Sequence, residues 1–475
     1  MGAVAVLLTV FSDGYGFHRD ELYFRMLEPR WGYVDQPPLT PLLVRFFSQH
    51  VADQPWAVRI PATASTVMSV LVVVLITREL GGGRGAQALC AWAYGFATTP
   101  LVFGHVMLTS SIDQVVWPLV TLLVIRAVLR AEPRWWLVAG VVVGLSMYNK
   151  LLVAMLLAAL VGGILLVGPR RLLISRWALG SAALALAIGS PNVVYQVTNH
   201  WPELTMGRAL ADNNSADVHV LMWPFLFILL GPPLAAVWVA GLVALWRRPA
   251  WRPVRFVAAG FPVFLVLVFV AGTQLYYPYG YLPVLLAAGC VPAAELAARS
   301  MRWRVLLIAA VVTNSLVSPL IALPIIPLSV VGSTPVPAIN QTAQDSVGWP
   351  TYVRQVARVY DALPPREARG AVIITSNYGE AGAVARYGPG LGLPGVYSAQ
   401  NQLYFQSRPP AGTRVAVVVG GEMPTFRREF RSCQVQRRLY NLEGVDNEDQ
   451  GEPVAVCRDP VGDWARVWSA LQHYD

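Results

Sequence analysis

The chain has 475 residues, of which 55% are hydrophobic and only 13% are charged, and its mean hydropathy is +0.49. Soluble proteins carry about 25% charged residues, so this composition excludes an ordinary soluble enzyme and indicates a multi-pass membrane protein. The net charge of +9 is best interpreted by location, because Arg-rich loops fix membrane orientation, and nucleic-acid binding is the weaker interpretation.

Apolar segments close to the length of a membrane span recur along the chain. The first segment lacks the basic region and the small-residue cleavage site of a signal peptide. We therefore expect a helix there, in a chain whose start is truncated or whose start codon is misassigned. Eleven spans are predicted in all, at residues 3–11, 58–77, 86–106, 112–130, 135–148, 151–168, 178–195, 219–246, 256–272, 281–298 and 304–330.

Arginines mark alternate loops between these segments. The Arg-rich loops follow the second, fourth, sixth, eighth and tenth segments, and the other loops hold few Arg, except the first. The positive-inside rule makes the Arg-rich loops cytoplasmic. The long first loop, residues 12–57, and everything after about residue 331 are then expected on the outer face of the cytoplasmic membrane.

Residues 135–168 are too long for one span and short for two, although Arg-rich loops flank them on both sides. The chain must therefore cross and return, and we expect the turn at Met147–Lys150. Thirteen residues from Trp135 to Met147 rise only about 20 Å, against a hydrocarbon core of about 30 Å. The turn is thus predicted within or just below the outer leaflet.

The first loop is predicted to be structured, with an amphipathic helix over residues 18–28. Three prolines then break the chain before a second short helix over residues 39–49, which we expect on the membrane surface. We assign this loop, residues 12–57, to a transmembrane domain that covers residues 1–333.

From about residue 334 the composition becomes that of a small extracytoplasmic α/β domain, residues 334–475. Strands are predicted at 371–375, 413–420, 433–439 and 453–458, and helices at 378–387 and 464–472. Cys433 and Cys457 both lie in this part, and outside the cytoplasm we expect a disulfide between them. No Cys or His spacing typical of a metal site occurs, so a divalent metal stays possible without a predicted site.

Charged residues gather in the first loop, where Asp20 and Glu21 are adjacent. On a helix their side chains point about 100° apart and can serve different partners. One carboxylate could act as a general base for an acceptor hydroxyl while the other orients it. The alternative is a solvated loop helix with incidental charges.

Two polar groups are predicted at membrane boundaries. Asp113 begins the fourth span, where a carboxylate is costly unless it is hydrogen-bonded or functional, although N-capping is the alternative. Lys150 is the only lysine among 36 basic residues and lies at the intramembrane turn. A compact ammonium there could hold a phosphate, and a snorkelling helix-end residue is the alternative.

Polar and aromatic residues also occur where two further spans meet the outer face. Gln196 and His200 follow the seventh span, and Tyr277 and Tyr281 follow the ninth. Aromatic rings there could stack on a sugar, but an interfacial aromatic belt is the commoner arrangement.

Two segments of the first loop together resemble a known family. Residues 19–23 read Arg-Asp-Glu-Leu-Tyr, and residues 31–41 read Trp-Gly-Tyr-Val-Asp-Gln-Pro-Pro-Leu-Thr-Pro. With Asp113 and the large exterior C-terminal domain, they resemble the GT-C membrane glycosyltransferases over about residues 10–330. The nearest branch is that of bacterial relatives of the dolichyl-phosphate-mannose protein mannosyltransferases and the aminoarabinose lipid A transferase. Residues 376–382 and 397–401 resemble one actinobacterial-type subgroup.

The resemblance implies a transferase that uses a polyprenyl-phosphate sugar at the outer membrane face, with a protein, lipid or cell-wall glycan as acceptor. It places Asp20 beside the anomeric carbon with Glu21 next to it, Asp113 at the membrane edge and Lys150 at the lipid phosphate. All of these residues are expected on one face of the membrane. Single displacement would invert the anomeric centre.

The sequence departs from this branch just before Pro37. A lysine often stands there, whereas this chain has Gln36 behind Asp35. The phosphate contact would then be a neutral hydrogen bond, and Arg19, Arg59 or Lys150 could replace the missing cation.

Two other classes of function compete with the transferase. A transporter would use Asp113 and Lys150 as coupling or substrate groups, but no convincing inverted repeat occurs. A membrane-anchored sensor of cell-wall sugars would not explain why polar residues cluster at several outer-leaflet helix ends.

Overall fold

The computed structural model describes all residues from Met1 to Asp475, and the chain forms two compact units. The helical unit comprises Met1–Ser12, Gln36–Thr40 and Arg59–Leu323. The loop–sheet unit comprises Asp13–Asp35, Pro41–Val58 and Pro324–Asp475. This division differs from the one expected from the sequence, because most of the first loop groups with the C-terminal residues instead of with the membrane helices.

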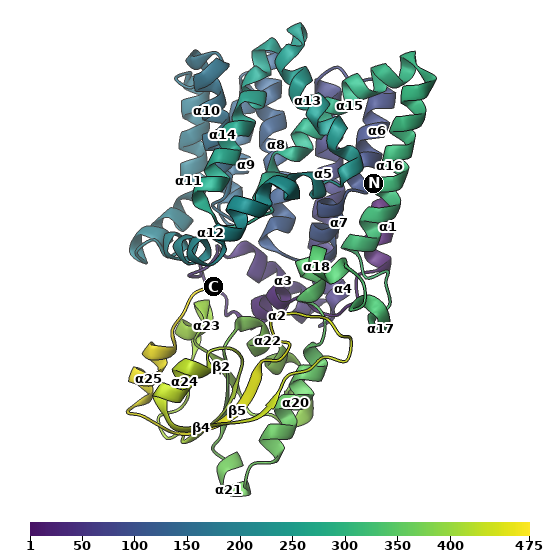
Figure 1. Ribbon diagram of the computed structural model, residues 1–475. Helices are drawn as coiled ribbons and strands as arrows, with labels where there is room; N and C mark the ends of the chain where they lie inside the picture. Colours follow the sequence, from purple (N-terminus) through teal and green to yellow (C-terminus); the bar gives the residue numbers. More distant parts are fainter. The chain divides into compact units, whose positions relative to one another are not determined.

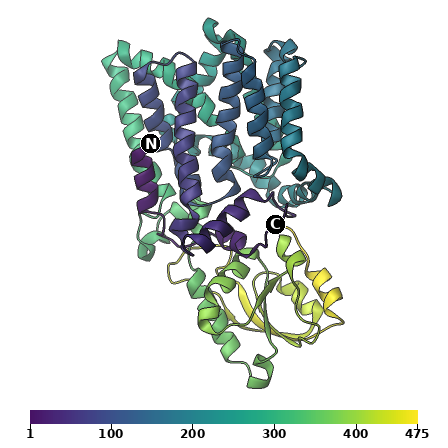
Figure 2. The same cartoon turned by 180° about the vertical axis from the view of Figure 1, so that it is seen from behind.

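The helical unit is a bundle of long helices that run side by side in both views (Figures 1 and 2). Six helical segments are long and apolar enough to cross a membrane, and a seventh is obtained if the bent pair α12–α13 counts as one span. The main helices of this unit are α1 (Gly2–Val10), α5 (Ile60–Glu79), α6 (Arg84–Gly95), α7 (Thr98–His105), α8 (Thr109–Leu129), α9 (Arg134–Ser146), α10 (Val153–Val167), α11 (Arg176–Thr198), α12 (Pro202–Ile228), α13 (Ala235–Arg247), α14 (Arg255–Ala271), α15 (Leu282–Arg299) and α16 (Met301–Ala322).

The count of long spans is lower than eleven because several predicted spans are short or broken. The segment predicted at 86–106 divides into α6 and α7, and the segment at 219–246 bends by 76° between α12 and α13. At that break Gly231 has a φ of 98°, a left-handed conformation that favours glycine. The helices α9 and α10 have only 13 and 15 residues.

The predicted turn between two short helices is confirmed. Helix α9 ends at Ser146 and α10 begins at Val153. Backbone bonds from Asn149 and Lys150 to the Ser146 carbonyl oxygen close the turn, at 2.8 and 3.0 Å. Lys150 is therefore held directly at the end of a helix that is too short to span about 30 Å by itself.

Small residues bring the helices of the bundle close together. A Cβ atom on Gly241 of α13 would lie 1.9 Å from the Leu285 carbonyl oxygen of α15. A Cβ on Gly289 of α15 would lie 1.8 Å from the Val237 carbonyl oxygen of α13. Only glycine fits such a backbone contact, which is a common packing device between membrane helices.

Helix α16 is apolar on its outer face and polar within the bundle. Ile308 and Leu316 are 56% and 66% exposed, whereas Asn314 and Ser318 are each 2% exposed. The Asn314 side chain donates to the Leu230 carbonyl oxygen at 3.2 Å. This arrangement suits a lipid environment, in which polar groups must be satisfied inside the protein. The protein is a membrane protein.

The loop–sheet unit contains a five-stranded sheet with the order β2-β1-β3-β5-β4. The first three strands in this order are parallel, and β5 and β4 continue antiparallel. Helices α24 (Met423–Glu429) and α25 (Trp464–Leu471) pack on one face, and α20 (Trp349–Asp361) and α22 (Tyr378–Tyr387) lie on the other (Figure 1). The strands are β1 (Val372–Thr375), β2 (Val396–Ser398), β3 (Val415–Val419), β4 (Phe430–Arg438) and β5 (Pro453–Pro460).

The helices of this unit come from both ends of the chain. The first-loop helices are α2 (Arg19–Met26), α3 (Leu39–His50) and α4 (Pro55–Val58). The C-terminal helices are α17 (Leu328–Val331), α18 (Val336–Ile339), α19 (Gln341–Gln344), α20 (Trp349–Asp361), α21 (Pro365–Ala368), α22 (Tyr378–Tyr387), α23 (Asn401–Gln406), α24 (Met423–Glu429) and α25 (Trp464–Leu471).

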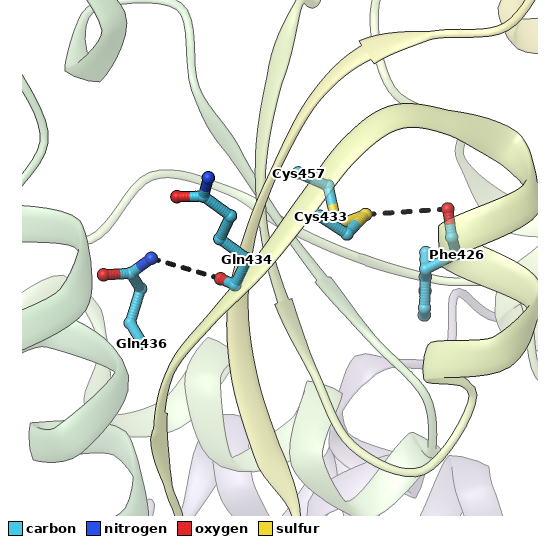
Figure 3. The surroundings of a disulfide bond; sticks show 5 residues. All are labelled: Phe426, Cys433, Gln434, Gln436 and Cys457. Carbon is cyan, nitrogen blue, oxygen red and sulfur yellow. Dashed lines mark hydrogen bonds between the residues drawn. A yellow bond between two sulfur atoms is a disulfide. The ribbon is translucent and has the colours of Figure 1, made fainter.

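A disulfide joins the two strands at one edge of the sheet (Figure 3). Cys433 of β4 and Cys457 of β5 are directly opposite each other in the antiparallel register, with their Cα atoms 4.0 Å apart. The Cys433 Sγ lies 3.6 Å from the Phe426 carbonyl oxygen of α24. This is the pairing expected from the sequence. The other two cysteines, Cys90 and Cys290, are buried and unbridged.

The first loop is fastened to the C-terminal part by packing and by side-chain bonds. Helix α2 crosses α22 at Gly382, where an added Cβ would lie 2.6 Å from the Leu22 Cβ. Asp53 forms ion pairs with both Arg25 and Arg386, at 2.6 and 3.1 Å. These contacts explain why the loop belongs to the loop–sheet unit, since Gly382 and Arg386 lie more than 300 positions after their partners Leu22 and Asp53.

Candidate functional site

Two clusters of polar residues are candidate functional groups, one in each unit. The loop cluster consists of Arg19, Asp20, Asp345, Tyr378 and Glu448, all in the loop–sheet unit. The bundle cluster consists of Asp113, Asn149, Lys150, Tyr276 and Tyr277, all in the helical unit. That Asp20 shares one site with Asp113 and Lys150 stays a prediction.

Asp20 lies in the first turn of α2, and its side chain is only partly buried. The Tyr378 hydroxyl donates to the Asp20 Oδ1 at 3.0 Å. This is the hydrogen bond that the structure gives to the Asp20 carboxylate, so Oδ2 stays available to a substrate. A carboxylate with one oxygen held and one open can accept a proton.

Glu21 has a different environment from its neighbour. Its side chain is fully buried, and its Oε2 accepts the His18 backbone N–H at 2.9 Å. The His18 ring in turn accepts the Asp20 backbone N–H at 3.1 Å, which completes a capping box at the start of α2. Glu21 thus fixes the helix that presents Asp20, and its carboxylate does not face solvent.

Arg19 is a buried cation surrounded by acidic groups. Its guanidinium is hydrogen-bonded to the Glu448 carboxylate and lies 4.6 Å from the centroid of the Tyr378 ring. Its Nε has no partner. Asp345 and Asp20 also interact with this charge. Arg19 therefore offsets part of the negative charge of the loop cluster, and these contacts leave it little freedom to meet a lipid phosphate.

Burial changes the protonation of carboxyl groups near this cluster. Burial raises the pKa of Asp345 to about 8, although Arg19 opposes the shift. It raises the pKa of Asp35 to about 7, where the Tyr23 hydroxyl opposes the shift. The Asp35 Oδ1 is buried without a partner. The pKa of Asp345 lies above 7 and that of Asp35 close to 7, and both side chains are buried, whereas Asp20 and Glu448 are the partly exposed carboxylates of the loop cluster.

Asp113 lies in the first turn and a half of α8 and is 8% exposed. The Asn149 Nδ2 donates to its Oδ1 at 2.9 Å, whereas its Oδ2 is buried without a partner. Its side chain does not cap α8, because the N-cap contact at Leu108 comes from Ser111. An unsatisfied buried carboxylate oxygen is costly, which is the property expected of a functional group.

Asn149 connects Asp113 to the start of α3. It is fully buried, and its Oδ1 accepts the Thr40 hydroxyl at 2.7 Å. Its Nδ2 donates to the Thr109 carbonyl oxygen at 2.8 Å as well as to Asp113. One amide therefore ties three segments of the helical unit together and fixes the orientation of the carboxylate.

Lys150 faces two aromatic rings at the turn. Its Nζ lies 5.1 Å from the centroid of the Tyr277 ring and 6.0 Å from that of Tyr276. Its charge also acts on Asp113. A cation held against ring faces and close to a single carboxylate keeps its positive charge available for an anion.

A small cavity of about 30 Å³ borders the bundle cluster. This volume suits one or two water molecules and not a sugar. A sugar does not fit in this cavity. Asp113, Tyr276 and Tyr277 therefore contact only a small part of any substrate through it. The cavity is lined by Phe103, Ser110, Asp113, Gln114, Trp117, Pro118, Leu152, Tyr276, Tyr277, Tyr279, Gly280 and Pro283.

Other predicted site residues lie elsewhere or have structural partners. Arg59 is 1% exposed and its guanidinium contacts the Ser12 carbonyl oxygen and the His105 ring. The Tyr281 hydroxyl donates to the Val257 carbonyl oxygen at 2.8 Å in the core. Arg59 and Tyr281 therefore hold helices together, and neither lines the cavity.

The remaining predicted residues divide between a helix turn and a loop. Gln196 donates to Glu203 across the turn from α11 to α12, at 2.9 Å. His200 is exposed in that turn with a φ of 60°. Gln36 is 8% exposed, and its Nε2 is buried without a partner. The side-chain amide of Gln36 thus has an unused hydrogen-bond donor, whereas the amide of Gln196 donates to Glu203.

No group of three or more His, Cys, Asp or Glu side chains is arranged to hold a metal ion. The acidic residues of the loop cluster surround an arginine instead.

Known proteins resemble this chain in part of its sequence and in its fold. The family described as dolichyl-phosphate-mannose-protein mannosyltransferase matches residues 35–195. No curated protein sequence matches the chain significantly. ArnT from Cupriavidus metallidurans in the apo state is similar in structure, with a TM-score of 0.62, 15% identity and 96% of each chain covered.

The same ArnT bound to undecaprenyl phosphate gives a TM-score of 0.62 and 16% identity, over 96% of this chain and 97% of that one. The chain has a GT-C fold. The predicted resemblance is confirmed: residues 35–195 match the mannosyltransferase family, and the fold is similar to that of ArnT. An oligosaccharyltransferase from Archaeoglobus fulgidus is a more distant structure, with a TM-score of 0.45, 13% identity, and 80% of this chain and 61% of that one covered.

Three residues of this GT-C chain were not singled out from the sequence. Asn149 lies within the predicted turn, next to Lys150, and an amide at an intramembrane turn could have indicated it. Tyr276 adjoins Tyr277 in one aromatic run. Tyr378 follows Asn377 in an N-x-x-E pattern after a strand, which is the signature of a capped helix start.

Proposed function

We propose that the protein is a glycosyltransferase that moves a sugar from a polyprenyl-phosphate donor to an acceptor hydroxyl at the outer face of the cytoplasmic membrane. The observation that carries this proposal is Lys150 beside an incompletely satisfied Asp113 in a GT-C fold. A lipid-phosphate donor needs a fixed cation near the membrane surface, and Lys150 supplies one. The loop–sheet unit, with its disulfide, is proposed to be extracytoplasmic.

Asp20 is the proposed general base. It takes the proton from the acceptor hydroxyl while that oxygen attacks the anomeric carbon. The bond between the anomeric carbon and the phosphate oxygen breaks at the same time, and the leaving polyprenyl phosphate takes the electron pair. One displacement inverts the anomeric centre. Glu21 keeps the helix start in place and is not assigned a proton transfer.

Lys150 is proposed to stabilise the phosphate as negative charge develops on it. Asp113 and Asn149 set the electrostatic surroundings of this cation. The unused donor of Gln36 is available to a phosphate oxygen as a neutral hydrogen bond. Arg19 is not assigned to the phosphate, because its guanidinium is occupied by Glu448 and Tyr378.

The proposal is tested with the full-length protein in membrane vesicles. Radiolabelled polyprenyl-phosphate mannose, as a hexosyl donor, and polyprenyl-phosphate arabinose, as a pentosyl donor, are supplied separately. Protein, lipid and cell-wall glycan fractions are then counted, and free polyprenyl phosphate is measured. We expect label in one fraction together with an equal release of polyprenyl phosphate. Uptake of labelled donor or solute without bond cleavage would instead identify a transporter.

A further inference from the structure

Tyr378 connects the C-terminal part of the chain to the proposed base. It is the first residue of α22, and its hydroxyl donates to Asp20 at 3.0 Å across 358 positions of sequence. Burial raises the pKa of Tyr378 well above its usual range. The hydroxyl therefore stays protonated and acts as a donor to the carboxylate.

Two side chains pack against the Tyr378 ring. The Arg19 guanidinium lies 4.6 Å from its centroid, and the Tyr23 ring lies 4.7 Å away at an angle of 36°. Its backbone N–H donates to the Gln400 Oε1 at 2.6 Å. A ring with two packing partners and a fixed backbone can hold its hydroxyl in one place.

The segment before Tyr378 gives this ring a rigid support. Strand β1 ends at Thr375, and Asn377 caps α22 in a capping box with Glu380. The Glu380 Oε2 accepts the backbone N–H groups of Ser376 and Asn377, at 3.0 and 3.1 Å. The turn from strand to helix is thus fixed by its own side chains, and it presents Tyr378 to α2.

We propose that Tyr378 is a positioning residue for the transfer reaction, which holds the Asp20 carboxylate in the orientation that takes the acceptor proton. This inference rests on the proposed role of Asp20 as the general base. Oδ1 is occupied by the tyrosine hydroxyl, so Oδ2 is the oxygen that faces the acceptor. The C-terminal domain then contributes directly to the chemistry, beyond covering or anchoring the first loop.

The test is the Tyr378→Phe variant of the full-length protein, which keeps the ring and removes only the hydroxyl. Polyprenyl phosphate released from a labelled polyprenyl-phosphate sugar is measured in membrane vesicles. We expect kcat to fall roughly tenfold to hundredfold, with the donor KM changed by less than about twofold. Tyr360→Phe is the matched control, because that hydroxyl donates only to the Ala368 carbonyl oxygen in the same unit. It should keep wild-type kcat.

A double-mutant cycle separates this inference from the proposed function. The cycle uses an Asp20→Asn background, or Asp20→Glu if the first is too slow to measure. In that background, Tyr378→Phe should lower kcat by a much smaller factor than it does in the wild type. A wild-type kcat for Tyr378→Phe, or an equal loss of kcat in both backgrounds, would overturn the positioning role. Neither result would affect the assignment of Asp20 as the base. Full kcat for Asp20→Asn would overturn the base assignment itself, and the positioning role with it.

Discussion

The two clusters differ in how the chain assembles them. In the bundle cluster, Asn149 and Lys150 are adjacent, and Tyr276 and Tyr277 are adjacent, so short segments at helix ends supply most of the groups. In the loop cluster, Arg19 and Asp20 meet Tyr378 and Glu448 from the opposite end of the chain. Packing of the membrane helices brings these short segments together, whereas the loop cluster depends on docking of the first loop onto residues more than 350 positions later in the chain. The predictions below test this difference.

The largest effect is expected in the bundle cluster. Lys150→Met removes the cation proposed to stabilise the leaving phosphate, and transfer should fall by about 10²–10³-fold. The measurement is polyprenyl phosphate release in membrane vesicles. Arg170→Met is the control, since Arg170 is exposed and the substitution changes the net charge equally. Equal activity of the two variants would remove Lys150 from the mechanism.

The docking of the first loop is tested next. In Gly382→Val, the new side chain would meet Leu22, because even a Cβ lies 2.6 Å from the Leu22 Cβ. Overpacking of this kind costs about 1–3 kcal/mol, and displacement of α2 should lower transfer roughly tenfold or more. Thermal unfolding and transfer are measured together.

Gly390→Ala is the matched control for this docking prediction, since nothing lies within 4 Å of the added Cβ. Its transfer and unfolding temperature should equal those of the wild type. If Gly382→Val behaves like Gly390→Ala, the loop cluster does not depend on packing of α2 against α22.

A smaller effect is expected when Asp113 loses its tether. Asn149→Ala removes the donor at 2.9 Å and the acceptor of the Thr40 hydroxyl, so transfer should fall roughly tenfold. Asn199→Ala serves as the control because Asn199 is exposed. A wild-type rate for Asn149→Ala would show that the orientation of Asp113 does not matter for transfer.

The smallest effect is a pH dependence of stability in the loop–sheet unit. The pKa of Asp345 is raised by burial to about 8, whereas an unfolded Asp titrates near 3.9. The folded state binds this proton more firmly, so the group stabilises the fold below about pH 4 and this stabilisation is lost as the pH rises to about 8.

The unfolding temperature of the wild type should therefore fall by a few degrees between pH 5 and about 8.5, and Asp345→Asn should flatten that slope. His18, Arg19, Asp20, Glu448 and Asp449 are the charged or titratable groups that face Asp345, and Asp449, whose pKa burial raises to about 6, contributes to the remaining slope. Asp361→Asn, at an exposed position, should keep the wild-type slope. A steeper slope in Asp345→Asn would contradict this assignment.

Local patterns explain which parts of the fold the sequence could predict. The helix expected at 378–387 is α22, and the helix expected at 39–49 is α3, which runs from Leu39 to His50. Proline, capping residues and apolar periodicity mark such elements within a few residues of sequence. The turn at Lys150 was predictable for the same reason, because the Arg-rich loops on both sides and the short apolar segments between them are all visible in one short stretch of sequence.

The rest of the fold depends on contacts that carry no local signal. Strand β2 has only three residues, Val396–Ser398, and was not predicted. The docking of α2 on α22 arises from a glycine that meets Leu22 more than 350 positions earlier in the chain. The site shows the same limit, since Asp20 and Asp113 stand out as charges in sequence, whereas Tyr378 acquires a role only through that docking.

The most direct test of the account is transfer by Asp20→Asn, measured in membrane vesicles with a labelled polyprenyl-phosphate sugar. Glu28→Gln is the matched control, because Glu28 is an exposed carboxylate just after α2. We predict that Asp20→Asn loses about 10²–10⁴-fold in kcat, with Glu28→Gln unchanged and both proteins folded. Transfer by Asp20→Asn at the wild-type rate would contradict the account.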